Sequence, residues 1–395
     1  MRVLMISDVY FPRVNGVSTS ILTFQQELAE QGHYVHIVAP QYPAGHPEMP
    51  HITRVESGYV MLDPEDRLMK SAKIYDLLPR FREQNFDIVH IQTPFLAHYA
   101  GIKLARALNI PTIETYHTFF EEYLYHYVPV MPKFITRRIT RSFSRSQCNS
   151  VDAVIVPSIA MSKVLQQYGC NTPIHIAPTG IQMAKFEAGD GARFRAKHDI
   201  PDDRHLLLHV GRVAHEKNIG FLLTVLDHLR VAHPNVLLLI CGEGPAKSDL
   251  EQQVKRMGLN DNVMFVGYLD RETELLDCYR AADVFIFASR TETQGLVLLE
   301  AMALGVAVVS TAVMGTIDIL SPNRGALVAE EEVGDFSTKI SRLLKDKALR
   351  LQIGGEGREY AKTWSAPATA RRVVDIYQGV IDSKNSQMAQ AVGAT

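Results

Sequence analysis

Short apolar runs that alternate with longer amphipathic segments constrain the fold of this chain more than any other feature. The runs of the first half are 3–6, 35–38, 88–91, 112–115 and 154–156, and those of the second half are 206–210, 236–240, 263–266, 284–287 and 306–309. Continuous apolar runs bounded by polar, Gly or Pro residues are typical of strands buried on both faces of a parallel sheet. Amphipathic patterns such as 20–31 and 220–233 predict helices between them. Two successive series of this kind predict an α/β chain with two doubly wound domains.

A turn-forming cluster, Pro178-Thr179-Gly180, predicts the boundary between the two domains. We expect a first domain at 1–178, a second at 179–364 and a C-terminal helical segment at 365–384, with its amphipathic helix at about 367–381. The tail at 385–395 holds small and polar residues, which predict a frayed end.

Composition excludes several classes of protein. The chain has 395 residues, with 41 Lys and Arg against 43 Asp and Glu, and this balance does not favour binding to nucleic acid. The four cysteines have no CxxC spacing, so neither a disulfide framework nor a zinc site is predicted. No apolar stretch approaches the ~18 residues of a spanning helix, and the N-terminus lacks the apolar core of a signal peptide. We therefore expect a cytoplasmic protein whose membrane contact, if it has any, is peripheral.

The densest cluster of polar residues follows the apolar run 284–287. Glu292 lies in the predicted loop, Gly295 opens the next helix, and Glu300 lies one to two turns into that helix. The carboxyl end of a strand is where doubly wound sheets bind ligands, and helix N-terminal amides bind phosphate. Two carboxylates on either side of such a helix start suit a nucleotide sugar. The alternative is a capped helix with solvent-facing glutamates.

Two further loops at strand ends carry candidate residues. Arg212 and Lys217 follow the run 206–210 and could clamp a diphosphate, or could belong to a solvated surface loop. His117 follows the run 112–115 and could orient a sugar or an acceptor hydroxyl, although a lone histidine is more often structural. Gly16, after the first run, would allow close approach of the backbone to a ligand.

Other chemistries lack their motifs. The nearest approach to a dinucleotide-binding fingerprint is Gly242-Glu243-Gly244-Pro245, which lacks the third glycine and loses an amide donor at the proline. No HExxH or DxD pattern supplies a metal site, and no Gly-x-Ser-x-Gly elbow is present. Dehydrogenase, metal-dependent and serine-hydrolase chemistry are not supported.

The combined motifs resemble a known family over nearly the whole chain. Glu292-x7-Glu300 lies within Ser-x-x-Glu-x-x-Gly-Leu-x-x-x-Glu-Ala, preceded by Gly211-Arg212-x4-Lys217 and Gly242-x-Gly-Pro245. This pattern resembles the family-4 retaining glycosyltransferases of the GT-B fold. The resemblance implies two facing Rossmann-like domains, with the final helix crossing back to the first domain. It also implies transfer of a sugar with retention of configuration and without a bound metal or other cofactor, the nucleotide sugar being a substrate.

The resemblance also implies roles for individual residues. Arg212 and Lys217 would contact the donor diphosphate, Glu300 the ribose, and Glu292 with the amides of Gly295 and Leu296 the sugar and phosphate. The implied catalytic residues are His117, Glu292, Arg212 and Lys217. The implied donor-binding residues are Gly16, Arg212, Lys217, Gly267, Tyr268, Glu292, Gly295, Leu296 and Glu300. Gly267 and Tyr268 would lie near the base, His117 near the reacting centre and Gly16 near the donor phosphate.

One departure from the family pattern narrows the resemblance. Much of the family reads Glu-x-Phe-Gly where this chain has Glu292-Thr293-Gln294-Gly295. With the segment 116–123, this variant is most similar to bacterial diacylglycerol glucosyltransferases. It implies transfer of glucose from UDP-glucose to diacylglycerol at the inner face of the cell membrane. The alternatives are a GDP-mannose-dependent lipid mannosyltransferase, a transferase with a soluble acceptor, and a GT-B nucleotide-sugar epimerase or binding protein.

A basic segment fits the membrane interpretation. Between Tyr123 and Val151 no acidic residue occurs, and the predicted helix there carries Lys133, Arg137, Arg138, Arg141 and Arg145. Ile135, Ile139 and Phe143 recur on one helical face, nearly opposite three of the arginines, and aromatic and apolar residues at 123–131 precede the helix. A basic amphipathic helix is attracted to anionic lipid. The alternative is that the apolar face packs on the protein core and the arginines are solvated.

Overall fold

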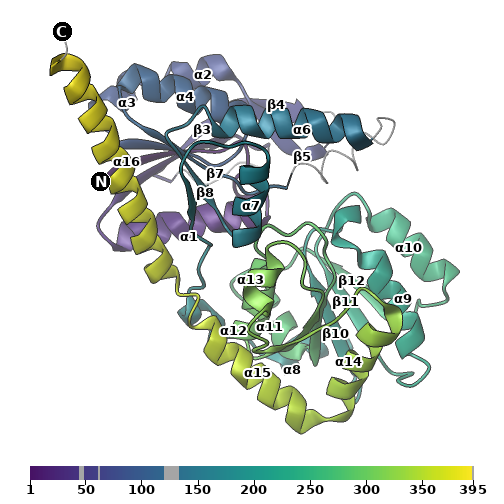
Figure 1. The fold of residues 1–395 in the computed structure, drawn as a ribbon. Coiled ribbons are helices and arrows are strands. Elements are labelled where there is room, and N and C mark those ends of the chain that lie inside the picture. The colour runs from purple at the N-terminus through teal and green to yellow at the C-terminus, as the bar shows by residue number, and fades with distance from the viewer. Residues whose placement is uncertain (44–48, 61–62, 120–132, 394–395) are drawn as a thin grey trace. The chain divides into compact units, whose positions relative to one another are not determined.

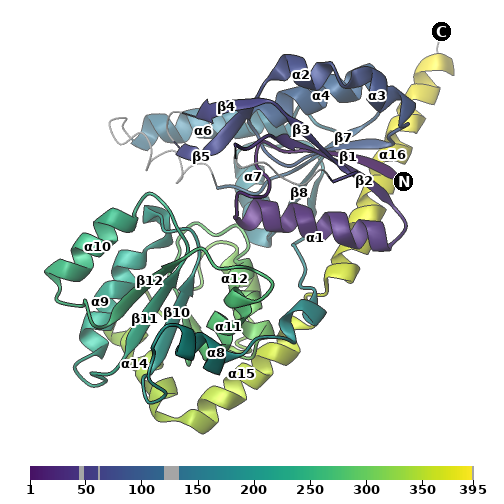
Figure 2. The same cartoon turned by 180° about the vertical axis from the view of Figure 1, so that it is seen from behind.

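The computed structural model describes residues 1–43, 49–60, 63–119 and 133–393. The chain forms two compact units (Figures 1 and 2). One unit comprises Met1–Gly180 together with Ala366–Thr395, and the other comprises Ile181–Ser365. The last helix therefore belongs to the unit that the N-terminal half builds.

The first unit is built on a parallel sheet whose strand order is β3-β2-β1-β6-β7-β8-β9. Its strands are β1 (Arg2–Ile6), β2 (Tyr34–Pro40), β3 (Ile52–Val55), β6 (Ile88–Ile91), β7 (Thr112–Thr115), β8 (Ala153–Val156) and β9 (Ile174–Ile176). A separate hairpin pairs β4 (Ser57–Val60) with β5 (Asp63–Met69). The chain order reverses between β1 and β6, which makes their carboxyl ends the switch point of this sheet.

Helices cover both faces of this sheet. They are α1 (Gly16–Glu30), α2 (Ser71–Tyr75), α3 (Leu78–Glu83), α4 (Leu96–Leu108), α6 (Lys133–Cys148), α7 (Ile159–Gln167) and α16 (Ala366–Gly393). Alternate residues of β1 point to opposite faces. Val3 and Met5 join the core formed with α1 and α16, which lie side by side in Figures 1 and 2. Ile6 lies on the other face, beneath Gly101 of α4.

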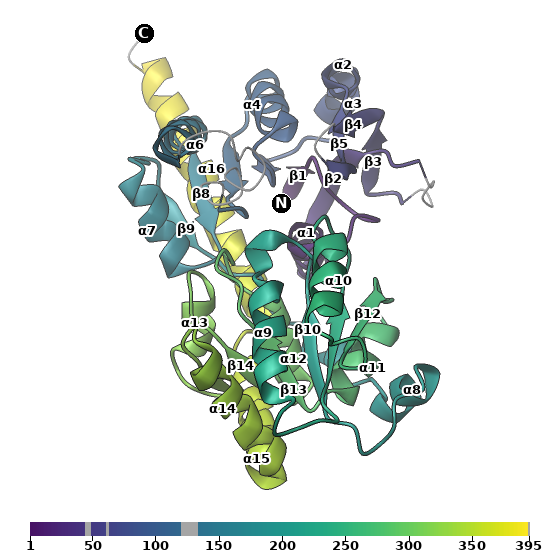
Figure 3. The ribbon, with the colours of Figure 1, turned by 90° about the vertical axis from the view of Figure 1, so that its right-hand side faces the viewer.

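The second unit repeats the plan with the parallel strand order β12-β11-β10-β13-β14-β15. Its strands are β10 (Leu206–Val210), β11 (Leu237–Cys241), β12 (Val263–Gly267), β13 (Val284–Phe287), β14 (Ala307–Ser310) and β15 (Ala326–Val328). Here the order reverses between β10 and β13, so the switch point lies between these two strands (Figure 3).

Two apolar clusters fill the two faces of this second sheet. Leu206 and Leu208 of β10 join the cluster that α8, α11 and α12 cover, and Leu207 joins the cluster beneath α9, α10 and α14. The helices are α8 (Gly191–Lys197), α9 (Ile219–Leu229), α10 (Lys247–Arg256), α11 (Glu274–Ala281), α12 (Leu296–Ala303), α13 (Thr316–Leu320), α14 (Val333–Lys345) and α15 (Lys347–Ala361). Two short 3-10 turns, Met183–Phe186 and His215–Lys217, complete the unit. Burial on both faces explains why these strands read as continuous apolar runs.

The predicted α/β architecture is confirmed, and each of the ten predicted apolar runs contributes a strand. The last helix is longer than the sequence indicated, because α16 continues through the polar residues 385–393 instead of fraying there. Within the described residues, none of the helices is long and apolar enough to cross a membrane.

Candidate active site

Two of the predicted catalytic residues meet at the switch point of the second unit. Lys217 comes from the loop after β10, and Glu292 comes from the loop after β13, the neighbouring strand. The Nζ atom of Lys217 donates to Oε1 of Glu292 at 2.5 Å, and the two side chains are only 19% and 18% exposed. A charge-assisted hydrogen bond in a partly buried position fixes both side chains. The pair places a cation and a carboxylate at the edge of the sheet where ligands bind in such folds.

The loop that carries Arg212 and Lys217 is held by the loop after β11. A Cβ atom on Gly242 would lie 2.0 Å from the carbonyl oxygen of Gly211, and one on Gly244 would lie 2.4 Å from that of Val213. The amide of Val213 also donates to the carbonyl of Glu243 at 2.9 Å. From the sequence, these glycines formed an incomplete dinucleotide fingerprint and part of the motif pattern that resembles the family-4 glycosyltransferases. Their backbone packing accounts for them, because they let two ligand-side loops lie against each other.

The helix start after Glu292 has the predicted form. Gly295 adopts the left-handed conformation (φ 96°) as the N-cap of α12, and Leu296 begins the helix. The loop after β14 supports this start, since the amide of Gly315 donates to the carbonyl of Glu292 at 2.8 Å. The first amides of α12 have no partner within the helix, so they are suited to bind an anionic group.

Glu300 is buried (3% exposed) and does not face bulk solvent, contrary to the alternative considered from the sequence. Nη2 of Arg271 donates to its Oε1 at 2.6 Å, and the hydroxyl of Tyr279 donates to its Oε2 at 3.0 Å. The sequence analysis identified neither partner. Arg271 follows β12 at the same edge of the sheet as the other candidates. Its position after a predicted strand was the one feature of the sequence that could have identified it as a site residue.

Gly267 and Tyr268 lie at the end of β12, on the chain segment that leads to Arg271. Gly267 has a left-handed backbone (φ 70°), and Tyr268 leaves 45% of its surface exposed. An exposed aromatic ring after the carboxyl end of a strand is a suitable surface for a nucleobase.

His117 lies in the first unit, in the loop after β7. Its Nε2 is 2.9 Å from Oε1 of Gln92, which follows the neighbouring strand β6. Burial lowers the pKa of His117 to about 4, so the ring is neutral near pH 7. A neutral imidazole held by a glutamine can exchange hydrogen bonds with a hydroxyl group, but it is no proton donor at that pH.

Gly16 is the first residue of α1, and a Cβ atom there would meet nothing within 4 Å. The side chain of Asn15 caps the helix by accepting from the amide of Ser18 at 2.8 Å. Packing within the described residues therefore does not require a glycine at this position, and the helix N-terminus is open to an approaching group.

Helix α6 buries mostly polar side chains and exposes several apolar ones. The residues that it buries are the polar Thr136, Thr140, Ser144 and Gln147, together with Cys148 at its last position. Phe134, Ile135 and Ile139 are 72%, 36% and 49% exposed, and Phe143 is half-buried. The alternative in which the apolar face packs on the core therefore fails for Ile135 and Ile139. The polar face makes the contacts instead, since the hydroxyls of Ser144 and Tyr116 lie 2.6 Å apart.

The basic residues of α6 flank this exposed apolar strip. Arg137, Arg138, Arg141 and Arg145 are all exposed. Arg141 also lies over the ring of Tyr168. The side chain of Lys133 and the segment 123–131 lie outside the described residues, so their predicted part in membrane binding stays a prediction. Among the described residues, no group of three or more His, Cys, Asp or Glu side chains is arranged to hold a metal ion.

Comparisons with known proteins agree with this geometry. Residues 14–185 match the model of Glycosyltransferase Family 4, and residues 190–360 match that of Glycosyl transferases group 1. The chain is 35% identical over 323 residues to an alpha-monoglucosyldiacylglycerol synthase of Streptococcus pneumoniae, covering 78% of this chain and 71% of that protein. It is 25% identical over 398 residues to a GDP-mannose-dependent alpha-mannosyltransferase of Mycobacterium tuberculosis, covering 98% of this chain and 99% of the relative.

A solved structure of Anabaena Alr3699/HepE in complex with UDP-glucose has the same fold, with a TM-score of 0.78 at 15% identity over 96% of this chain and all of the other. The two sheets, their switch-point loops and these relatives lead to one assignment. The chain belongs to the family-4 glycosyltransferases of GT-B fold, with a group 1 glycosyltransferase domain in its second half.

Proposed function

We propose that this glycosyltransferase moves glucose from UDP-glucose to diacylglycerol at a membrane surface, with retention of configuration and without a metal ion. The donor would bind at the switch point of the second unit. There Lys217 and Arg212 would hold the diphosphate, and the amides of Gly295 and Leu296 would add uncharged donors. Glu292 would hold the sugar, Glu300 the ribose, and Gly267 and Tyr268 the base.

The chemistry that this arrangement would support is stabilisation of a leaving nucleoside diphosphate. As the bond between the sugar's anomeric carbon and the phosphate oxygen breaks, negative charge grows on the diphosphate beside Lys217 and Arg212. Cations fixed at that place would stabilise the negative charge as it develops. Such electrostatic stabilisation is usually the largest single contribution to catalysis. The acceptor oxygen bonds to the anomeric carbon from the side of the leaving group, and its proton passes to the departing phosphate. His117, neutral at pH 7, would orient a hydroxyl and would not supply a proton.

One observation carries the lipid acceptor: helix α6 buries its polar side chains and exposes Phe134, Ile135 and Ile139 beside a row of arginines. Such a helix loses apolar exposure and gains attraction to anionic headgroups when it lies in a membrane interface. The relative from Streptococcus pneumoniae, whose name specifies a diacylglycerol product, supports the same acceptor.

A second candidate is a mannosyltransferase that uses GDP-mannose and a lipid. The observation that favours it is the alignment with the Mycobacterium tuberculosis enzyme along almost the full length of both chains. The membrane-facing helix would serve either acceptor, so donor choice distinguishes the two candidates.

A radiolabelled transfer assay tests the proposal. UDP-glucose, UDP-galactose and GDP-mannose are each offered with diacylglycerol in mixed micelles, with a soluble sugar acceptor in parallel, and each mixture is run with and without EDTA. We expect labelled lipid from UDP-glucose in both conditions, with an α linkage. Labelled lipid only from GDP-mannose would favour the second candidate. Product only on the soluble acceptor would contradict the lipid assignment. Loss of activity with EDTA would contradict the metal-independent mechanism.

A further inference from the structure

Glu300 is held by two side chains that the proposed donor contacts do not include. Its carboxylate receives a hydrogen bond from Arg271 at one oxygen and from Tyr279 at the other. Tyr279 is fully buried, and the side chain of Arg271 is 30% exposed. A buried carboxylate with a donor on each oxygen has a fixed plane and fixed remaining lone pairs.

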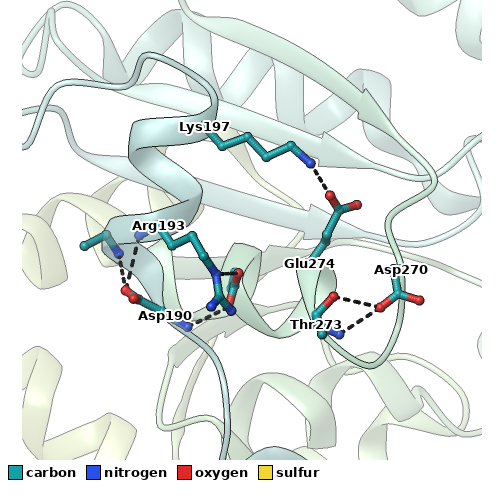
Figure 4. A network of polar contacts seen from close by, with 8 residues as sticks. Asp190, Arg193, Lys197, Asp270, Thr273 and Glu274 are labelled. Carbon is teal, nitrogen blue, oxygen red and sulfur yellow. Dashed lines mark hydrogen bonds and ion pairs between the residues drawn. The ribbon is translucent and has the colours of Figure 1, made fainter.

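The loop that brings Arg271 to this position is itself braced. Oδ1 of Asp270 accepts from the amide and the hydroxyl of Thr273, both at 2.9 Å (Figure 4). It also accepts from the amide of Glu272 at 3.1 Å, so hydrogen bonds hold the turn that contains Arg271. The following helix, α11, is bound to α8 by a bidentate pair of Arg193 with Asp277, at 2.6 and 2.8 Å. Lys197 adds an ion pair with Glu274 at the start of the same helix.

The protonation states of Arg271 and Tyr279 keep both hydrogen bonds to Glu300 in place near pH 7. The carboxylate of Glu300 raises the pKa of Arg271, so the guanidinium stays charged. Burial raises the pKa of Tyr279 well above its usual value, so its hydroxyl stays protonated and donates. A charged arginine also offsets the cost of burying the glutamate in a position where few waters reach it.

We propose that Arg271 and Tyr279 are positioning residues for donor binding: they orient the Glu300 carboxylate so that its free lone pairs accept from the vicinal hydroxyls of the donor ribose. This inference rests on the ribose role that the proposed function gives to Glu300. Pre-orientation matters because a carboxylate that can rotate must lose that freedom when the ribose binds. Arg271 therefore affects nucleotide affinity only when the nucleotide carries the two ribose hydroxyls.

The test is a binding cycle with two nucleotides. Dissociation constants are measured by calorimetry for UDP and for 2′,3′-dideoxy-UDP on the wild-type protein, Arg271→Met, Tyr279→Phe, Glu300→Ala and the double variant of Arg271→Met with Glu300→Ala. We expect Arg271→Met to weaken UDP binding about ten-fold, as for the loss of a charged hydrogen-bond partner. Dideoxy-UDP binding should change less than about two-fold, and Tyr279→Phe should show a smaller effect with the same selectivity.

Three further arms separate a positioning role from a structural one. In the Glu300→Ala background, Arg271→Met should have no further effect on UDP affinity, because its route to the ribose is gone. Lys362→Met, which removes an exposed cation paired with Glu359 elsewhere in the same unit, should leave both affinities unchanged. Arg271→Lys, which keeps the charge, should restore part of the UDP affinity, with the dideoxy analogue again unaffected.

The outcomes distinguish this inference from the proposed function. Equal weakening of both nucleotides by Arg271→Met, or weakening of neither, overturns the positioning role. If Glu300→Ala weakens the binding of UDP and of dideoxy-UDP equally, the ribose role that the proposed function gives to Glu300 is wrong. If the wild-type protein binds GDP but not UDP, only the choice of donor is wrong, and the same cycle with GDP and its dideoxy analogue decides the role of Arg271.

Discussion

At the scale of single residues, the pair of Lys217 and Glu292 is the centre of the proposed donor site. Both side chains are about four-fifths buried, so neither cation nor carboxylate is fully screened by water. A bound diphosphate would compete with Glu292 for the ammonium group. In the proposed function, the pair would hold Lys217 in place until the diphosphate binds.

We expect Lys217→Met to lower the rate of sugar transfer about 100-fold, because a fixed cation no longer stabilises the leaving diphosphate. The measurement is kcat with saturating donor and acceptor. Lys247→Met is the matched control: Lys247 pairs with Glu243 at 2.8 Å in the same unit, and its loss should leave kcat within about two-fold. A wild-type rate for Lys217→Met would contradict the clamp.

Gly242 is one of the residues at which the backbone leaves least room for a side chain. Its φ is 135°, and a Cβ atom would lie 2.0 Å from a backbone oxygen that cannot move without shifting the Arg212 loop. We expect Gly242→Ala to lower the free energy of unfolding of the second unit by about 2–4 kcal/mol, measured by urea titration. Gly258→Ala, left-handed at φ 63° with open space around it, should cost only about 1 kcal/mol. Equal effects of the two variants would show that backbone strain alone matters.

At the scale of elements, helix α6 reverses the usual relation between polarity and burial. Thr136, Thr140 and Ser144 face inward, and the apolar and basic residues share the exposed arc. The C-terminal end is fixed as well, because Asn149 accepts from the amide of Asn171 at 2.8 Å. The helix is therefore attached to the first unit through hydrogen bonds, and its apolar residues remain available to a lipid surface.

We expect replacement of Arg137, Arg141 and Arg145 by Ser to weaken binding to anionic liposomes by about 3 kcal/mol at low salt. The difference from wild type should shrink as salt rises, because screening already weakens the charges. Sedimentation with liposomes measures it. Replacing the exposed Lys197, Lys255 and Lys362 by Ser removes the same charge from the other unit and should have little effect. Equal losses in the two variants would mean that net charge, and not the helix, directs binding.

The apolar half of the same helix gives a separate prediction. Ile135→Ser with Ile139→Ser should reduce liposome binding at high salt as well as at low salt, since the loss of buried apolar area is not screened. Salt-sensitive loss alone would indicate that these residues do not enter the interface.

At the scale of the whole molecule, buried histidines make stability depend on pH. Burial lowers the pKa of His90, in the first unit, to about 3 and that of His209, in the second, to about 4. Each pKa is lower in the folded state than in the unfolded chain, so the unfolded state binds more protons as the pH falls below about 6.5. Each histidine then contributes stability that is complete at neutral pH and declines towards the folded-state value.

We expect each unit to lose about 2 kcal/mol of unfolding free energy per buried histidine between pH 7.5 and pH 5. Urea titrations at the two pH values, with the transitions of the two units followed separately, measure the loss. His90→Gln should reduce the pH dependence of the first unit by about 2 kcal/mol and leave the part due to His36 and His117, whereas His51→Gln, at an exposed position, should not reduce it. A pH dependence unchanged by His90→Gln would remove His90 as its source.

The amino-acid sequence by itself determined ten of the strands, the doubly wound class and the loops that carry the candidate site. Strands buried on both faces must be apolar throughout, and the carboxyl ends of parallel strands share one edge, so local pattern was sufficient. The pattern did not identify the edge strand β3 (Ile52–Val55) or the helical continuation of α16, where neighbouring elements outweigh weak local signals.

Only the tertiary structure decided which side chains meet. Lys217 and Glu292 are 75 positions apart, and Arg271 and Glu300 are 29 apart, so no spacing rule relates the members of either pair. Likewise, the helical period of α6 showed that the helix has distinct faces but not which one is buried. That choice depends on partners such as Tyr116, which are brought to the helix by the fold.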